Sequence, residues 1–367
     1  MKVLHIISGD LWGGAEAMAF SLIKELSNYK NVQISAIILN EGKLSNKLND
    51  LPIETKVIDE KYINFASIYK ECKSWFTKNP HDVIHSHRYK ENILAYLISR
   101  KVKNIKLVAT QHGVPNSEQA ERNINIKHRF VLEVNNKILA GKFDKLVVVS
   151  NDMKRYYSEN IQFKEDALEM IHNGIILPNV SEIHSDKKVF FIGSIGRLFP
   201  VKDYTLFVKI ANEISKVSKE IKYVLAGDGP ERVIIQQLVN QYGLQDSFKI
   251  IGVLDDTTKF YQDIDVYLNT SLSEGLPLSV LEAMAHGVPV IAANVGGIKE
   301  IIAKEDQGIL INGRNPMDFA EKCLMLVQNG NLRKSMGFKG RERIIDAFSV
   351  GKMAKKYYSL YSELINF

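Results

Sequence analysis

Short apolar runs of strand length alternate with amphipathic helical stretches along almost the whole chain. This alternation is typical of parallel β-sheets whose strands are joined by crossover helices. The strands predicted in the first half are Val3–Ser8, Gln33–Leu39, Thr55–Ile58, Val83–Ser86, Leu107–Thr110, Lys145–Val149 and Ala167–Ile171. Those predicted in the second half are Phe190–Arg197, Lys222–Gly227, Phe248–Gly252, Asp265–Asn269, Pro289–Ala292 and Gly308–Ile311. The sequence therefore predicts an α/β protein.

A chain of 367 residues is too long for one ordinary hydrophobic core. A polar, poorly periodic stretch at residues 177–188 separates the two sets of strands. We predict two doubly wound domains, at residues 1–180 and 181–350. Residues 351–367 should form an amphipathic helix that packs near the domain junction, back toward the first domain. Open parallel sheets bind ligands outside the carboxyl ends of their strands, so we expect a deep cleft where the two domains face each other.

Composition places the chain among soluble globular proteins, since it is 45% hydrophobic and 25% charged. It contains no apolar run long enough to span a membrane. Its first residues, MKVLHIISGD, read as the opening of a strand rather than as a signal peptide. Cys72 and Cys323 lie in different halves without metal or redox spacing, which favours buried thiols in a reducing compartment. A cytoplasmic protein is predicted.

The net charge of +6 is distributed unevenly. Residues 1–180 carry 25 Lys and Arg against 20 Asp and Glu, whereas the remaining residues carry 23 against 22. Basic clusters in the first half occur at residues 100–106 and 127–129. They could meet the anionic cytoplasmic face of a membrane or a phosphate-bearing acceptor, or could simply be solvated helix faces. No nucleic-acid partner is expected.

The most informative segment is SEGLPLSVLEAMAHGVPV, from Ser273 to Val290. Glu274 lies in a Gly-Leu-Pro turn, and Glu282 lies in the first turns of the apolar helix that follows. A helix N-terminus suits a phosphate group, because its backbone N–H groups are unpaired and its dipole end is positive. A carboxylate nearby suits hydroxyl groups instead, as in dinucleotide sites. Phosphate beside hydroxyls outlines a sugar nucleotide, although a single Glu on a solvated helix would mean nothing.

Basic residues follow the first strand predicted in the second domain. Gly196 and Arg197 end that strand, and Lys202 comes shortly afterwards. Arginine offers a planar fork to phosphate oxygens, and lysine offers a point charge. Together they could neutralise a departing diphosphate.

Three loops after predicted strands carry further candidates. Gly13-Gly14 follow the first strand, where glycine permits close approach of a substrate, but the GxGxxG fingerprint of dinucleotide sites is missing. His112 follows another strand and could contact a sugar hydroxyl or a developing positive charge. His85 and His87 also lie at a strand end, where packing is the favoured role.

No metal is predicted. The spacing of His85, His87 and His112 is not that of a helical pair, and no carboxylate completes a ligand set. Asp263-Ile-Asp265 matches the Asp-x-Asp pattern of metal-dependent nucleotide-sugar enzymes. However, Asp263 ends a helical stretch and Asp265 opens a strand, so the two should point apart. The turn at residues 226–230, AGDGP, and Gly296-Gly297 with Glu300 read as further loops beside a ligand.

With these motifs, the chain resembles the retaining glycosyltransferases of family 4, which have the GT-B fold. The resemblance covers almost the whole length. It rests on the Gly13-Gly14 loop, the HSH segment, His112, VVVS…IHNGI, GRL with Lys202, AGDGP, Glu274-x7-Glu282 and Gly296-Gly297. The Glu-x7-Glu segment with Arg197 and Lys202 upstream is the specific part of it.

The resemblance implies roles at matching positions. Glu282 would bind the ribose of the donor nucleotide, and Glu274 would contact hydroxyls of the transferred sugar. Arg197 and Lys202 would hold the diphosphate, and His112 would assist an oxocarbenium-like state. Positions that would contribute mainly backbone contacts to the donor are Gly14, Gly196, Gly252, Leu254, Gly275, Leu276, Pro277, Leu278 and Ser279.

The implied reaction is transfer with retention from a nucleoside diphosphate sugar, a UDP sugar first and GDP-mannose next. Double displacement needs a nucleophilic carboxylate, and the chain offers no convincing one. The resemblance implies reaction on one face, with the leaving phosphate accepting the proton and no metal or other cofactor taking part. The acceptor would be a glycan or lipid-linked saccharide in capsule, lipopolysaccharide or other cell-surface polysaccharide synthesis.

Two alternatives stay open. A sugar-nucleotide epimerase or hydrolase can share the fold, and a catalytically degenerate transferase could serve as a scaffold in a polysaccharide complex. A dehydrogenase is least favoured, because GxGxxG is missing.

Overall fold

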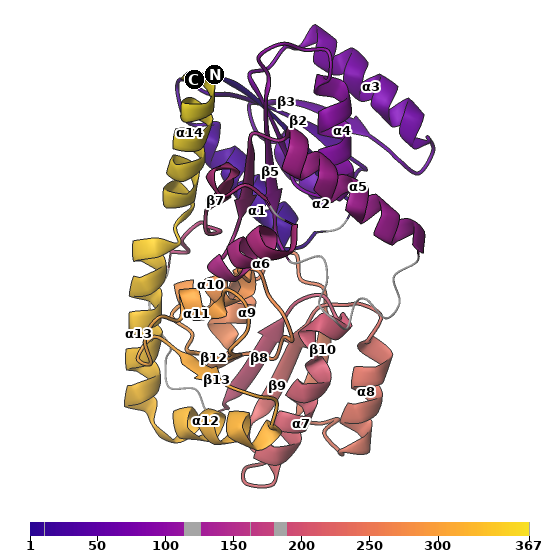
Figure 1. The fold of residues 1–367 in the computed structure, drawn as a ribbon. Helices are drawn as coiled ribbons and strands as arrows, with labels where there is room; N and C mark the ends of the chain where they lie inside the picture. The colour runs from indigo at the N-terminus through magenta and orange to yellow at the C-terminus, as the bar shows by residue number, and fades with distance from the viewer. Residues whose placement is uncertain (11, 114–125, 162, 180–188, 367) are drawn as a thin grey trace. The chain divides into compact units, whose positions relative to one another are not determined.

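The computed structural model describes residues 1–367 except 11, 114–125, 162, 180–188 and 367 (Figure 1). These residues form two compact units. Unit 1 comprises Met1–Gly174 together with Val350–Phe367, and unit 2 comprises Ile175–Ser349. The predicted boundary at residue 180, and most of the predicted linker, fall outside the described residues. The basic cluster at residues 127–129 has no described side chains.

Unit 1 is built on a seven-stranded parallel sheet with the strand order β3-β2-β1-β4-β5-β6-β7. Its strands are β1 (Lys2–Ser8), β2 (Gln33–Leu39), β3 (Glu54–Ile58), β4 (Val83–Ser86), β5 (Lys106–Gln111), β6 (Lys145–Val148) and β7 (Leu168–Met170). Its helices are α1 (Gly14–Leu26), α2 (Lys43–Asn49), α3 (Phe65–Lys78), α4 (Tyr89–Ser99), α5 (Ile126–Lys142), α6 (Asn151–Ile161) and α14 (Val350–Asn366). The strands β1 and β2 are rich in valine, leucine and isoleucine, and both of their faces are buried, as a parallel sheet covered by helices requires.

Unit 2 contains a six-stranded parallel sheet with the strand order β10-β9-β8-β11-β12-β13. Its strands are β8 (Phe191–Ile195), β9 (Lys222–Ala226), β10 (Phe248–Gly252), β11 (Val266–Asn269), β12 (Val290–Ala293) and β13 (Ile309–Ile311). Its helices are α7 (Tyr204–Ser215), α8 (Arg232–Gln241), α9 (Thr258–Asp263), α10 (Leu278–Ala285), α11 (Ile298–Ile301), α12 (Pro316–Gln328) and α13 (Gly330–Ala347).

The last helix, α14, belongs to unit 1, as expected of a C-terminal helix that returns to the first domain. It packs beside α1. The ring centroids of Tyr29 and Tyr358 lie 5.4 Å apart. Its buried face is Met353, Ala354, Tyr357, Leu360, Tyr361 and Leu364. This face repeats at helical spacing, so burying it anchors the end of the chain.

The doubly wound prediction is confirmed, and every predicted strand is present. Most strand ends lie within one residue of the prediction, and the largest difference is at the end of β8. β8 stops at Ile195, so Gly196 and Arg197 follow the strand rather than ending it. The chain turns there because Pro200 begins a 3-10 turn, Pro200–Lys202, directly before α7. Along the described chain, no helix combines the length and the apolar character needed to cross a membrane.

Candidate functional site

In both sheets the candidate residues gather where the strand order reverses. In unit 2 this point lies between β8 and β11, and in unit 1 it lies between β1 and β4. Open α/β sheets bind ligands at such a point, outside the carboxyl ends of the strands. Lys202 and Glu274 follow β8 and β11, whereas Gly14 and His87 follow β1 and β4. Sheet topology therefore selects the loops that the sequence motifs also select.

Lys202 and Glu274 form an ion pair, with 2.6 Å between Nζ and Oε1. The lysine side chain is 22% exposed and the glutamate side chain 8%. The same Oε1 accepts hydrogen bonds from the Ser271 hydroxyl at 2.6 Å and from the Asn269 amide at 3.4 Å. A largely buried carboxylate needs this number of donors. Glu274 is thus fixed independently of Lys202, which keeps two further N–H donors for a ligand.

Arg314 braces the loop that carries Glu274, and sequence reasoning missed it. Its guanidinium donates to the backbone oxygens of Ser271, at 3.0 Å, and Thr270, at 2.5 Å, and it also pairs with Asp203. Asp203 in turn caps α7, where its carboxylate accepts from the Leu206 N–H. One side chain therefore ties the β11 loop to the start of α7. Its position shortly after β13 carries no motif.

Two glycines allow the loops of unit 2 to touch. A Cβ on Gly296 would lie 1.8 Å from the backbone oxygen of Glu274, and one on Gly227 would lie 1.9 Å from that of Gly196. Both have positive φ, +54° and +135°. Gly297 also donates its N–H to the Gly275 oxygen at 2.9 Å. Backbone thus packs directly on backbone around Glu274, which holds the 273–277 loop in place.

Glu282 lies on α10 and is half-buried. Its carboxylate accepts a hydrogen bond from the Tyr261 hydroxyl at 2.9 Å. Burial raises the pKa of Glu282 to about 7, and the tyrosine bond opposes that rise. His286 stacks on Tyr261, with ring centroids 5.0 Å apart, and its Nδ1 lies 2.8 Å from the Glu282 backbone oxygen. Tyr261, which stacks on His286, therefore holds the Glu282 carboxyl group in one position.

The other residues of unit 2 that the sequence predicted beside the donor differ in exposure. Arg197 is exposed and lies over the Phe199 ring at 5.1 Å, and no carboxylate in the described chain pairs with it. Gly252 has φ +78°, with open space where a side chain would be, and Leu254 is half-buried beside it. Gly275, Leu276, Pro277 and Leu278 are buried, while Ser279 is half-buried in the first turn of α10. Glu300 lies on α11, half-buried.

In unit 1, the Gly13-Gly14 loop is tied to the end of β4 through Glu16. The Glu16 side chain is 1% exposed; it accepts the Gly13 N–H at 3.0 Å and pairs with Arg88. Sequence reasoning missed Glu16, because a glutamate in the first turn of a helix is usually read as solvated. The bond network fixes the glycine loop against the segment that carries His87 and Arg88.

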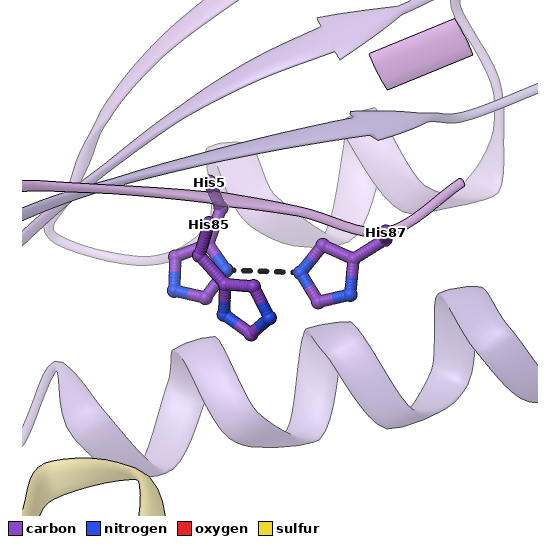
Figure 2. Close-up of side chains that lie close together, drawn as sticks. All are labelled: His5, His85 and His87. Carbon is purple, nitrogen blue, oxygen red and sulfur yellow. Dashed lines mark hydrogen bonds between the residues drawn. The ribbon is translucent and has the colours of Figure 1, made fainter. Parts of the chain in front are cut away.

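His87 itself belongs to a buried cluster with His5 and His85 (Figure 2). Nitrogen atoms from the three rings lie within 4.8 Å of one another, close enough to hold a metal ion. His85 is however already hydrogen-bonded at both nitrogens, to the Tyr361 hydroxyl at 2.6 Å and to the Thr110 hydroxyl at 2.7 Å. The three histidines therefore form part of a hydrogen-bonded network rather than a set of metal ligands. His112 continues it, with Nε2 3.4 Å from Nδ1 of His87.

The Asp-x-Asp pair forms no ligand set. Asp263 ends α9, and the buried Asp265 accepts the Phe191 N–H at 2.8 Å, next to the start of β11. Asp265 thereby joins the amino ends of two strands, at the sheet edge opposite Glu274. The basic segment at residues 100–106 also lies at an amino edge, since it connects α4 to β5.

Two family models match adjoining parts of the chain. Residues 12–177 match Glycosyltransferase Family 4, and residues 178–343 match Glycosyl transferases group 1. Together the two models span both units.

Curated relatives and solved structures agree with this. An N-acetyl-alpha-D-glucosaminyl L-malate synthase of Bacillus anthracis is 29% identical over 77% of this chain and 75% of its own length. A UDP-Gal:alpha-D-GlcNAc-diphosphoundecaprenol alpha-1,3-galactosyltransferase of Escherichia coli is 24% identical over 100% of this chain and 97% of its own. The crystal structure of Anabaena Alr3699/HepE in complex with UDP and glucose superposes with a TM-score of 0.84 at 17% identity, covering 99% and 100% of the two chains. This chain accordingly belongs to the group 1, family 4 glycosyltransferases and has their GT-B fold.

Proposed function

We propose that this glycosyltransferase moves a sugar, with retention and without a metal, from a UDP sugar to a glycan or lipid-linked saccharide in cell-surface polysaccharide synthesis. The observation that carries the proposal is the Lys202–Glu274 pair at the point of strand reversal, beside Arg197 and the first turn of α10. A diphosphate needs cations and N–H donors, and a sugar needs fixed hydrogen-bonding groups. The loops after β8 and β11 supply cations, backbone N–H groups and a fixed carboxylate.

Each group has a role in donor binding. Glu274 is held by Ser271 and Asn269, so it can accept hydroxyl protons of the sugar without moving. Lys202 can bridge Glu274 and the diphosphate, because an ammonium group has three donors. The exposed Arg197 adds a planar fork for phosphate oxygens. Glu282 would accept hydrogen bonds from ribose hydroxyls.

In the reaction, the bond between the anomeric carbon and the diphosphate oxygen breaks, and the acceptor oxygen forms a bond to the same face of that carbon. The acceptor's proton passes to the departing phosphate, so no protein nucleophile or base is consumed. The protein supplies positioning and charge stabilisation, and that stabilisation is greatest when the diphosphate carries its full charge.

The UDP preference and the saccharide acceptor are supported by the Escherichia coli galactosyltransferase, whose name includes a UDP-galactose donor and an undecaprenol-linked acceptor. Peripheral contact of the chain with the anionic cytoplasmic face of a membrane belongs to the same proposal. It is supported by the exposed Lys101 and Lys103. Failure to sediment with phosphatidylglycerol vesicles would remove that part.

The testing experiment is saturation-transfer NMR of the purified protein with UDP, GDP and ADP sugars. We expect binding of UDP sugars, and loss of that binding in Glu282→Ala. Anomeric proton couplings of the product formed on GlcNAc-diphosphoprenol would then report retention or inversion. Binding of no nucleotide would favour a degenerate scaffold, and conversion of the sugar without an acceptor would favour an epimerase or hydrolase.

Lys202→Ala should lower kcat by about 100- to 1000-fold, that is about 2.7–4 kcal/mol of barrier, with a smaller effect on the KM for the donor. Circular dichroism should show a folded protein. Lys216→Ala is the matched control, because Lys216 forms an exposed ion pair with Glu213 on the same unit. Wild-type turnover in Lys202→Ala would contradict the assignment.

A further inference from the structure

Three imidazoles form a continuous chain toward the carboxyl edge of the unit 1 sheet. Nδ1 of His5 lies 3.1 Å from Nε2 of His87, and Nδ1 of His87 lies 3.4 Å from Nε2 of His112. Figure 2 shows the first of these two bonds, with the rings of His5 and His87 facing each other. Each contact joins the two ring nitrogens that an imidazole can use to pass on a hydrogen bond.

Strand register creates this chain. His5 on β1 pairs with His85 on β4, so the two side chains share one face of the sheet. His87 lies one residue past the end of β4, and its ring contacts that of His85. His112 follows β5, the next strand in the sheet. The three residues therefore step across neighbouring strands, from the buried core to the loop after β5.

His85 packs against the hydrogen-bonded row His5–His87–His112 but does not take part in its hydrogen bonds. Its ring centroid lies 4.3 Å from that of His87 and 4.9 Å from that of His5. Tyr361 and Thr110 occupy its two nitrogens. Thr110 is itself bonded to the Tyr357 hydroxyl at 2.8 Å. Two tyrosines of α14 therefore hold His85 and Thr110 in place behind the three imidazoles.

Burial keeps every member neutral. It lowers the pKa of His5 to about 3 and that of His112 to about 3, and it lowers the pKa of His87 well below 6.5. A neutral imidazole has one N–H donor and one acceptor nitrogen. The chain can therefore point in only two directions, from His5 to His112 or from His112 to His5.

The unpaired nitrogens at the two ends choose between these directions. Nε2 of His5 and Nδ1 of His112 are both buried atoms without a hydrogen-bond partner among the described residues. His5 is 0% exposed, whereas His112 is half-buried. An unpaired N–H in a closed core is rarer than an unpaired acceptor. The unpaired N–H therefore belongs at His112, which follows the strand end and is only half-buried, rather than at His5 in the closed core.

We propose that His5 and His87 are positioning residues that hold His112 as the Nδ1–H tautomer, so that it presents an N–H donor to an oxygen of the donor sugar. This rests on the proposed function for the identity of the ligand, but not for the tautomer itself. The direction of donation is His5 Nδ1–H to His87 Nε2, then His87 Nδ1–H to His112 Nε2. Histidine side chains in water favour the other tautomer, so the protein must impose this one.

The test begins with the unmodified protein, labelled with ¹⁵N in histidine. Long-range ¹H–¹⁵N correlation spectra at neutral pH should show His5, His87 and His112 as Nδ1–H tautomers. An Nε2–H tautomer at His112 would overturn the proposal. One equivalent of bound transition metal, measured by elemental analysis, would overturn it too, because coordination would occupy nitrogen lone pairs that the chain needs.

Two substitutions then separate positioning from packing. In His87→Asn the side-chain amide nitrogen can replace Nδ1 and still donate to His112, whereas His87→Phe fills the space without a donor. We expect His112 to keep its tautomer in the Asn variant and to change to Nε2–H in the Phe variant. An unchanged tautomer in a folded His87→Phe protein would contradict the proposal. His81→Asn, a residue stacked on Trp75, is the control.

Activity gives an independent reading. His87→Phe should lose on the order of 10-fold in kcat with little change in the KM for the donor sugar, as when a hydrogen-bonded partner behind a functional histidine is removed. His87→Asn should recover part of the loss. If the wild-type protein shows the predicted tautomers but transfers no sugar, the proposed function fails and the positioning chain stands.

Discussion

At the residue scale, Glu282 carries a carboxyl group that costs the unliganded protein stability. Burial raises its pKa to about 7, from an ordinary value near 4.5. Between these two values the folded state holds a proton that the unfolded state has released. Stability contributed by this group is therefore full below the unfolded pKa and is lost as the pH rises through about 7.

Glu282→Gln should remove this titration while keeping an acceptor for the Tyr261 hydroxyl. The variant should gain stability over wild type as the pH rises from about 4.5 to 7, by at most about 3 kcal/mol, since partial exposure screens the effect. Thermal midpoints at pH 5 and pH 8 measure it, and the gain in midpoint should be much larger at pH 8. Glu321→Gln, at a side chain 74% exposed, is the control. A variant no more stable than wild type at pH 8 would show that Glu282 is ionised at little cost.

At the scale of loops and elements, close backbone contact positions the 273–277 loop. Gly296→Ala should destabilise unit 2 and weaken UDP-sugar binding, because its Cβ would meet the Glu274 backbone oxygen at 1.8 Å and its φ is +54°. Gly313→Ala separates the effect of positive φ from the effect of the steric contact. Its φ is +88°, and nothing lies within 4 Å of the added Cβ. It should cost only the backbone term, about 1–2 kcal/mol.

Urea unfolding and calorimetric titration of the two glycine variants provide the comparison. Equal losses of stability and affinity in both would mean that the contact with Glu274 does not position the loop. A larger loss in Gly296→Ala alone is the expected result.

Sequence pattern predicted the elements well because parallel strands buried on both faces leave continuous apolar runs. It also selected Lys202 and Glu274 as candidates, since each follows a predicted strand within a motif. Arg314 could not be found in this way: it reaches Asp203 and the Ser271 oxygen from a loop far along the chain. His5 was hidden inside an apolar strand, and only the register of β1 with β4 brings it to His85. The roles assigned to the site residues stay predictions.

At the scale of the whole molecule, unit 1 depends on the last residues of the chain. Removing residues 350–367 takes away Tyr357 and Tyr361, which bond Thr110 and His85, and exposes the apolar face beneath α14. Hydrogen exchange should rise sharply in β1, β4 and β5 of the truncated protein, while β8, β9 and β11 keep their protection. Uniform loss of protection in both units would contradict this independence.

The membership of α14 in unit 1 also orders events during synthesis. Unit 2 is an uninterrupted segment of the chain inserted into unit 1, so all of its residues leave the ribosome before the final helix does. The N-terminal half, although made first, must wait for the last stretch of polypeptide to close its core, which reverses the usual N-to-C order of domain completion. Until then the histidine cluster lacks its tyrosine partners, and a nascent chain that stalls before residue 350 has emerged would carry a finished unit 2 and an open unit 1.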